Sequence, residues 1–453
     1  MSEKILTRRH FLQTAVLAAP ALSLSAEETR TIDRPNIILI MADDLGYGDL
    51  GCYGCEDIQT PYIDGLAREG VRMTDYYASA PVCTPTRCAL LTGRYQQRVP
   101  NMEWALPPGT QSAGLLNQET TIASMLREAG YSTGLFGKWH LGYREEWGPL
   151  RHGFDEFFGF LSGNIDYFRH KNRLGDPDLY ENGQPVSTEG YITDIIAQHA
   201  VEFIQRRREK PFFLYAPFNA PHWPIQGPDD KDKELNEANW SQGGERSDYA
   251  KMAERMDAGI GAILGELKSQ GLEENTLVVF CSDNGGGRLG RNAPLSGRKG
   301  HLREGGIRVP CLLRWPKYLP PGKVCSQAAI VMDLSSTIMA AARVKPSRWF
   351  DGFNMMRILI GERDEVEQTL VWRNTLHKEK ALRWGKWKWL EENGEDYLFN
   401  LKEDIAERTN LKDRNFDILY WLKRIYEQWE QAMPYRQTLF GEDLKKAEAL
   451  SNM

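Results

Sequence analysis

Short apolar runs alternate with longer amphipathic segments along most of the chain. The run from Asn36 to Met41 is almost wholly apolar, and comparable strand-like runs occupy Tyr131 to Phe136, Pro211 to Tyr215 and Thr276 to Ser282. Runs of this length are typical of parallel strands that are buried on both faces. Amphipathic helices are expected between them: Thr60-Pro61 to Gly70, Thr121 to Ala129, Ile192 to Arg208, and Ser247 to Gln270. This alternation predicts an α/β fold with a large, mostly parallel sheet sandwiched by helices.

The pattern changes from about Arg363 onwards. Strand-like segments at Thr369 to Asn374, Lys380 to Leu390 and Tyr397 to Asn400 precede a helix from Asn415 to Ala432. Strands followed by a helix favour a smaller α+β domain that carries a short antiparallel sheet. We therefore predict a catalytic domain over residues 34–362 and a C-terminal subdomain over residues 363–453.

The N-terminal segment has the features of an export signal. Arg8 and Arg9 form a twin-arginine pattern, an apolar stretch runs from Phe11 to about Leu24, and small residues follow it. These features predict a Tat-type signal peptide over residues 1–26, with the Tat translocase as a partner and a periplasmic or secreted product. Because no apolar run in the sequence is long enough to span a bilayer, an integral membrane protein is not expected.

Composition narrows the possible functions. The net charge of −6 gives no electrostatic support for a nucleic-acid partner, and 41% hydrophobic with 26% charged residues is ordinary for a globular protein. Seven cysteines, an odd number, do not indicate a disulfide framework. Cys281 and Cys311 lie in apolar surroundings and are expected in the core.

Polar residues recur directly after the predicted strands. Asp43 and Asp44 follow the first run, and Asp283 and Asn284 follow the run that ends at Ser282. Open α/β sheets place their ligand sites at the carboxyl ends of strands, so we expect these segments to meet at one edge. Carboxylate and amide oxygens suit Ca²⁺, although oxygen ligands alone leave Mg²⁺ open.

The segment that begins Cys83-Thr84-Pro85-Thr86-Arg87 and continues to Leu91-Thr92-Gly93-Arg94 resembles the signature of the type I sulfatases, in the alkaline phosphatase superfamily. Thr86 stands where most members have serine. The resemblance implies that Cys83 is oxidised to Cα-formylglycine by a maturation enzyme. It also implies one Ca²⁺ per chain, with Asp43, Asp44, Cys83, Asp283 and Asn284 as ligands.

Three further segments resemble motifs of the same family: Gly137-Lys138-Trp139-His140-Leu141-Gly142, Ala220-Pro221-His222-Trp223-Pro224, and Ser296-Gly297-Arg298-Lys299-Gly300. By resemblance, Arg87 would hold the aldehyde hydrate, Lys138 and Lys299 would bind sulfate oxygens, and His140 would accept a proton during sulfate release. The spacing of Lys138 and His140 would point both side chains the same way on extended backbone.

His222 would be the general acid, for which a near-neutral pKa is suited. Trp223 is expected either to stack on a substrate ring or simply to pack, and His301 either to face the site or to be structural.

The resemblance implies hydrolysis of sulfate monoesters, most similar to the arylsulfatase and N-acetylgalactosamine-6-sulfatase group, with a sulfated small molecule or carbohydrate as substrate. A hydrated formylglycine would attack sulfur and form a covalent sulfate ester. A phosphate or phosphonate monoester hydrolase of the same superfamily stays open, as do cysteine-based hydrolysis and a catalytically inactive protein that binds sulfated glycans.

Overall fold

The computed structural model describes residues 34–206 and 210–434. The predicted signal peptide lies outside these residues, as do the last residues of the predicted C-terminal subdomain. In the part of the chain described, no helix combines the length and the apolar character needed to cross a bilayer.

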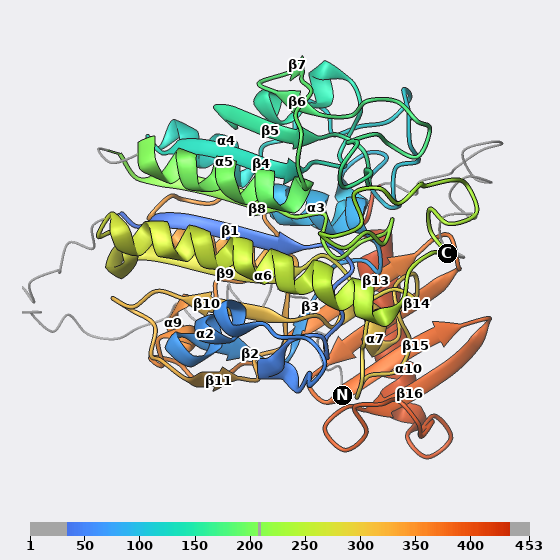
Figure 1. The fold of residues 1–453 in the computed structure, drawn as a ribbon. Coiled ribbons are helices and arrows are strands. Elements are labelled where there is room, and N and C mark those ends of the chain that lie inside the picture. The colour runs from blue at the N-terminus through green and yellow to red at the C-terminus, as the bar shows by residue number, and fades with distance from the viewer. Residues whose placement is uncertain (1–33, 207–209, 435–453) are drawn as a thin grey trace, which may run out of the picture. The chain divides into compact units, whose positions relative to one another are not determined.

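The centre of the fold is a ten-stranded mixed sheet with the order β11-β2-β10-β9-β1-β8-β4-β5-β6-β7 (Figure 1). The strands from β9 to β5 in this order run parallel to their neighbours, and antiparallel pairs occur towards both edges. The strands are β1 Asn36–Ala42, β2 Val71–Met73, β4 Ser132–Lys138, β5 Glu156–Phe160, β6 Tyr180–Glu181, β7 Gln184–Pro185, β8 Phe212–Pro217, β9 Thr276–Ser282, β10 Cys311–Arg314 and β11 Lys323–Cys325. Two short strands, β3 (Tyr76–Tyr77) and β12 (Ala329–Ile330), pair separately. The predicted α/β class is confirmed.

The apolar sequence of β1 follows from its place in the sheet. β1 pairs with β8 on one side and with β9 on the other, and its residues from Ile37 to Ala42 are fully buried. A strand with neighbours on both sides and helices on both faces has no position that favours a polar side chain. Polar side chains therefore occur only where the strand begins, at the partly buried Asn36, and just after it ends, at Asp43.

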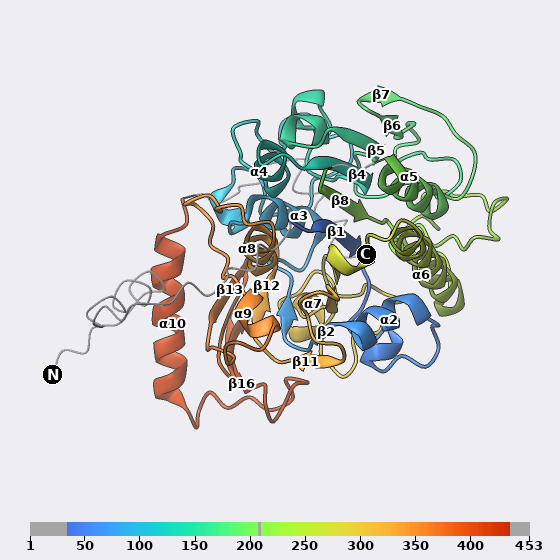
Figure 2. The same ribbon diagram turned by 90° about the vertical axis from the view of Figure 1, so that its left-hand side faces the viewer.

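Helices cover both faces of the sheet (Figure 2). The helices α2 (Pro61–Glu69), α5 (Ile192–Arg206) and α6 (Arg246–Ser269) lie on one face, and α3 (Cys83–Thr92), α4 (Ile122–Glu128) and α8 (Val331–Ala341) lie on the other. The amphipathic helix predicted from Ser247 to Gln270 is confirmed as α6, and its apolar stripe is fully buried: Met252, Met256, Ile260, Ile263 and Leu267. Two short helices, α7 (Glu304–Ile307) and α9 (Met356–Leu359), lie in the connections.

The C-terminal part contains a four-stranded antiparallel sheet and the helix α10 (Phe416–Gln431). The strands are β13 Thr369–Asn374, β14 Glu379–Trp384, β15 Trp387–Glu392 and β16 Glu395–Asn400. The single strand-like segment expected from Lys380 to Leu390 is wrong: it is a hairpin that turns at Gly385, whose φ of +52° favours glycine. Trp389 and α10 share one apolar cluster here. The domain boundary between residues 362 and 363 stays a prediction.

Candidate active site

Four segments far apart in the sequence meet at the carboxyl edge of the sheet. They follow β9, β1, β8 and β4, which are consecutive neighbours. Because Ala42 of β1 lies opposite Ser282 of β9, the next residues of the two strands, Asp43 and Asp283, emerge side by side. The juxtaposition expected from the sequence is confirmed, and its cause is the parallel register of these strands.

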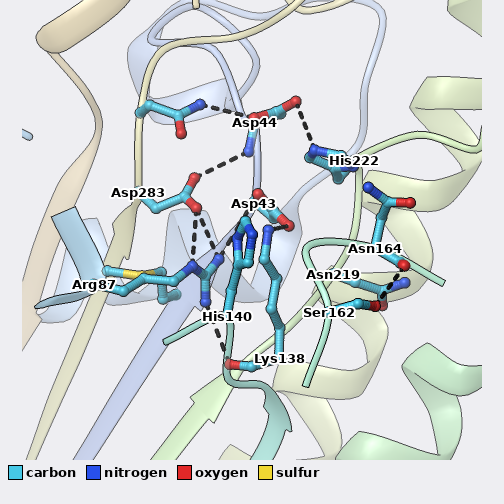
Figure 3. Close-up of polar contacts among 12 residues, drawn as sticks. Asp43, Asp44, Arg87, Lys138, His140, Ser162, Asn164, Asn219, His222 and Asp283 are labelled. Carbon is cyan, nitrogen blue, oxygen red and sulfur yellow. Dashed lines mark hydrogen bonds and ion pairs between the residues drawn. The ribbon is translucent and has the colours of Figure 1, made fainter. Parts of the chain in front are cut away.

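The acidic residues form a connected group (Figure 3). The backbone N–H of Asp44 donates to Oδ1 of Asp283 over 3.2 Å, and Nδ2 of Asn284 donates to Oδ1 of Asp44 over 2.7 Å. Oδ1 of Asp43 and Oδ1 of Asn284 are buried and accept no hydrogen bond from any described residue. Buried oxygens without donors are costly unless a cation binds them, so the donor set fits a hard divalent cation such as Ca²⁺.

Three cationic side chains face these carboxylates; those of Lys138 and Arg87 are buried, and that of Lys299 is partly buried. Nζ of Lys138 lies 2.5 Å from Oδ2 of Asp43, and Nη2 of Arg87 lies 2.8 Å from Oδ2 of Asp283. Nζ of Lys299 lies 2.7 Å from Oδ2 of Asp44. Each cation comes from a different segment, and together they make the site attractive to an anion.

The pKa values of the two neighbouring aspartates diverge. Burial and the charge of Asp283 raise the pKa of Asp43 to about 8, although Lys138 and Arg87 oppose the shift. Burial would also raise the pKa of Asp44, but His222 and Lys299 outweigh it and lower that pKa to about 2. A divalent cation between them would favour the ionised form of Asp43 as well.

Cys83 is the first residue of α3 and is 3% exposed. Its Sγ belongs to a group of possible ligand atoms, with oxygens of Asp43 and Asp44 and a ring nitrogen of His222, that all lie within 4.8 Å of one another. The amino-terminal end of a helix favours negative charge, so an oxyanion at position 83 would be stabilised there. Arg87, four residues later, lies on the same helix and points to Asp283, as Figure 3 shows.

His140 reaches the site by a different backbone path from the one expected. β4 ends at Lys138, and His140 has a left-handed φ of +57°, so the extended backbone predicted for this pair is wrong. Its ring Nε2 lies 3.0 Å from the carbonyl oxygen of Leu106, while Nδ1 is buried without a partner among the described residues. Burial and the charge of Lys138 hold the pKa of His140 well below its ordinary value, so the ring is kept neutral.

His222 lies between the second lysine and the acidic group. Its Nε2 is 3.0 Å from Nζ of Lys299 and 3.5 Å from Oδ2 of Asp44. Burial lowers the pKa of His222, and the charge of Asp44 partly offsets this shift. A substrate anion placed against this ring would raise its pKa towards the value that a general acid needs.

A pocket opens above these residues. Its wall includes Cys83, His140, His222 and Lys299, and also the two residues Trp223 and His301 that the sequence left open between substrate and structural roles. His301 lines the pocket and is also held by the C-terminal sheet, because Nδ1 of its ring lies 2.7 Å from Oε1 of Glu379 in β14.

The structure adds two polar residues, Ser162 and Asn219, that the sequence did not single out, and it places Asn164 in the pocket wall, as the sequence predicts for the segment from Gly163 to His170. Ser162, Asn164 and Asn219 lie beside Lys138 and His222 in Figure 3, and the amide of Asn219 is buried without a hydrogen-bond partner among the described residues. Asn219 comes two residues after β8, so its position at a strand end was a usable signal. Ser162 follows β5 in the segment Leu161 to Ile165, which contains no acidic residue or histidine.

Known proteins are similar to this chain. The sulfatase family matches residues 35–344. Steryl-sulfatase of Mus musculus is 33% identical over 441 residues, with 77% of this chain and 69% of that protein covered. N-acetylgalactosamine-6-sulfatase of Canis lupus familiaris is 34% identical, with 72% of this chain and 66% of that protein covered. The chain thus spans about two thirds of the length of these relatives.

A solved structure covers more of the chain. The crystal structure of Ps i-CgsB in complex with k-i-k-neocarrahexaose superposes with a TM-score of 0.83 at 34% identity, and covers 93% of this chain and 98% of its own. With the family match, this agreement confirms the resemblance seen in the sequence. The chain belongs to the sulfatase family of sulfuric ester hydrolases.

Proposed function

We propose that this protein hydrolyses sulfate monoesters of a carbohydrate at the pocket above Cys83. The observation that carries the proposal is the convergence of two lysines, the buried Lys138 and the partly buried Lys299, and two histidines on one buried cysteine inside a sulfatase motif. The carbohydrate class is supported by Ps i-CgsB, whose structure contains a neocarrahexaose.

A sulfate ester would bind by its charged oxygens. Lys138 and Lys299 pair with different aspartates of the acidic group, Asp43 and Asp44, and supply two ammonium groups in a largely buried setting of low dielectric constant. There they would be worth more than in water, and they need no reorganisation when negative charge develops on the sulfuryl oxygens.

Members of the sulfatase family typically use Ca²⁺ and a formylglycine, and the residues here fit both. Asp43, Asp44, Asp283 and Asn284 would hold the ion, which when bound supplies Lewis acidity and compensates negative charge. Arg87 keeps Asp283 ionised and oriented, since it lowers the pKa of that carboxyl against the effect of burial.

Position 83 would act as the nucleophile once oxidised and hydrated. One of its two hydroxyl groups gives its proton to the nearby carboxylate of Asp43 and forms the new S–O bond. The S–O bond to the sugar breaks at the same time, and its oxygen takes a proton from protonated His222. His140 then accepts the proton of the second hydroxyl, the bond between Cβ and the sulfate oxygen breaks, and the carbonyl re-forms as sulfate leaves. Addition of water restores the hydrate.

The decisive test uses protein made in a host that has the formylglycine-generating enzyme. Mass spectrometry of the tryptic peptide containing position 83 should show formylglycine, and the same preparation should release sulfate from 4-nitrophenyl sulfate. A Cys83→Ala variant, which should fold normally by circular dichroism, should lose turnover by a factor on the order of 10⁴. Full activity with an unmodified thiol would refute the proposal and favour cysteine-based hydrolysis.

A second comparison separates the remaining alternatives. Turnover of a sulfate and a phosphate ester of the same phenol should favour sulfate, whereas a preference for phosphate would indicate a phosphate or phosphonate monoester hydrolase. Fully modified protein that binds sulfated glycans without cleaving them would indicate an inactive binding protein.

We also propose export by the Tat route. Cys83 would then be oxidised in the cytoplasm before the chain folds and is exported, because Tat substrates cross the membrane folded. Fractionation of cells that express the full chain should place the protein outside the cytoplasm, and replacement of Arg8 and Arg9 by lysine should retain it inside.

A further inference from the structure

One loop lines the mouth of the active-site pocket with cationic side chains of two kinds: some are paired with a carboxylate, and one is not. Arg298, Lys299 and His301 are nearly consecutive and all line the pocket. Lys299 is pulled inward by its ion pair with Asp44, over 2.7 Å. Arg298 is exposed and forms no ion pair or side-chain hydrogen bond with any described residue.

A second arginine lines the same mouth from the glycine-rich loop after β9. Nη2 of Arg288 donates to the carbonyl oxygens of Gly243 and Gly244, over 2.6 and 3.3 Å. These neutral acceptors fix the direction of the guanidinium group and leave its charge uncompensated. Arg288 and Arg298 are therefore two positive charges at the pocket mouth that the described part of the chain does not pair with a carboxylate.

The rest of the pocket wall does not neutralise them. Asp44 is the single carboxylate among the described residues that line the pocket, and it is already engaged by Lys299 and Asn284. His301 has its own carboxylate partner, Glu379, at 2.7 Å. The two sulfate-binding lysines, Lys138 and Lys299, belong to the reaction centre and would pair with the scissile sulfate. The two arginines therefore add positive charge that a single sulfate group does not neutralise.

The pocket is also small. Its volume of about 150 Å³ is below the roughly 300 Å³ of pockets that enclose a drug-sized ligand. It suits the scissile sulfate and the ring that bears it, and the remainder of a longer saccharide would lie across the mouth, against the arginines.

We propose that Arg288 and Arg298 form a second anion subsite, and that the preferred substrate is a saccharide with another anionic group besides the sulfate that is removed. The group is either a second sulfate ester or a uronic acid carboxylate, since guanidinium groups bind both through paired N–H donors. This inference rests on the proposed function, because the scissile sulfate fixes where the second group falls.

The test measures inhibition of 4-nitrophenyl sulfate turnover by matched oligosaccharides. Neocarrabiose with one sulfate is compared with neocarrabiose with two, and a 6-sulfated chondroitin disaccharide with its carboxyl-reduced form. Wild-type protein should bind the more anionic member of at least one pair about fivefold or more tightly, as two partly exposed charge pairs allow. Arg288→Ala and Arg298→Ala should each bring that ratio towards one.

The matched control is Arg408→Ala, which removes an exposed arginine that does not line the pocket and should leave the ratio unchanged. The pair that discriminates identifies the second group as sulfate or carboxylate. Equal binding within both pairs, or a preference that survives both arginine replacements, overturns the inference.

Calorimetry on the full-length Cys83→Ala protein gives the same ratios without turnover. If the matured protein cleaves no sulfate ester but these binding ratios behave as described, the proposed reaction fails and the subsite stands. If cleavage occurs and the ratios do not respond, the subsite fails alone.

Discussion

Replacement of Lys388 by methionine tests how much the buried ion pairs between the C-terminal sheet and the loop that carries Lys299 stabilise the folded protein. Lys388 lies in β15 and is fully buried. Its Nζ lies 2.8 Å from Oε1 of Glu407 and 3.0 Å from Oε1 of Glu304, and donates to the carbonyl oxygen of Leu302 over 2.7 Å. Glu407 in turn accepts a hydrogen bond from Oγ of Ser296, at the start of the Lys299 loop.

Removal of one partner from a buried ion pair costs about 3–5 kcal/mol, because the other charge stays buried without compensation. Glu304 retains Arg308 at 3.2 Å and the hydroxyl of Tyr77 at 2.6 Å, so the uncompensated carboxylate is that of Glu407. We expect Lys388→Met to lower the unfolding temperature by about 5 °C, on the order of 1–2 °C per kcal/mol for a chain of this size.

The loss should depend on pH. Burial and Glu304 already raise the pKa of Glu407, and Lys388 opposes this. Without Lys388 the folded-state pKa rises further above the unfolded value, so Glu407 takes up a proton at low pH and the penalty disappears. As the pH rises above the unfolded pKa, the penalty grows by up to about 1.4 kcal/mol per pH unit. The deficit should therefore be larger at pH 8 than at pH 5.

Differential scanning calorimetry of Lys388→Met and two comparison variants tests whether the unpaired Glu407 causes the loss of stability. Lys388→Met with Glu407→Gln should recover most of the loss, because the unpaired charge is gone. Lys423→Met, which breaks a partly exposed pair with Asp396, should cost less than about 1 kcal/mol. A Lys388→Met deficit no greater than that control, or one that neither pH nor Glu407→Gln relieves, would contradict the reasoning.

Other outcomes follow from the site. His222→Ala should lower kcat/KM by about 10²–10⁴ for an alkyl sulfate and by less than about tenfold for 4-nitrophenyl sulfate, since a good leaving group needs no proton; equal losses would count against an acid role. Dialysis against EGTA should abolish turnover and lower the unfolding temperature, and Ca²⁺ should restore both; stability that is indifferent to Ca²⁺ would argue against a structural ion at Asp43 and Asp44. Although burial alone would raise the pKa of Glu304, Lys388 and Arg308 lower it to about 2 from 4.5. Its contribution to stability is thus present above pH 4.5 and lost as the pH falls towards 2, so Glu304→Gln should flatten the acid side of the stability profile.

Much of the architecture is readable from local pattern. The continuous apolar runs of β1 and β9 predict strands that are buried on both faces, and the apolar stripe of α6 predicts the face on which it packs. Both predictions succeed because the pattern of apolar residues directly reflects which side chains are buried. Motif positions such as Cys83, Lys138 and His222 were also identified from the sequence, since each stands in a short conspicuous segment. The hairpin between Lys380 and Leu390 was missed, as its turn at Gly385 interrupts an otherwise continuous strand-like composition.

The sequence by itself determined which residue types stand at the ends of the strands. Only the tertiary structure decided which charged residues become neighbours. Asp43 lies beside Asp283, Lys388 of the C-terminal sheet is buried between Glu304 and Glu407, and Arg288 and Arg298 line the same pocket. Periodicity is a property of neighbours along the chain, whereas a charge is compensated or left exposed by neighbours in space. The order of the strands sets those neighbours, and no local signal encodes it.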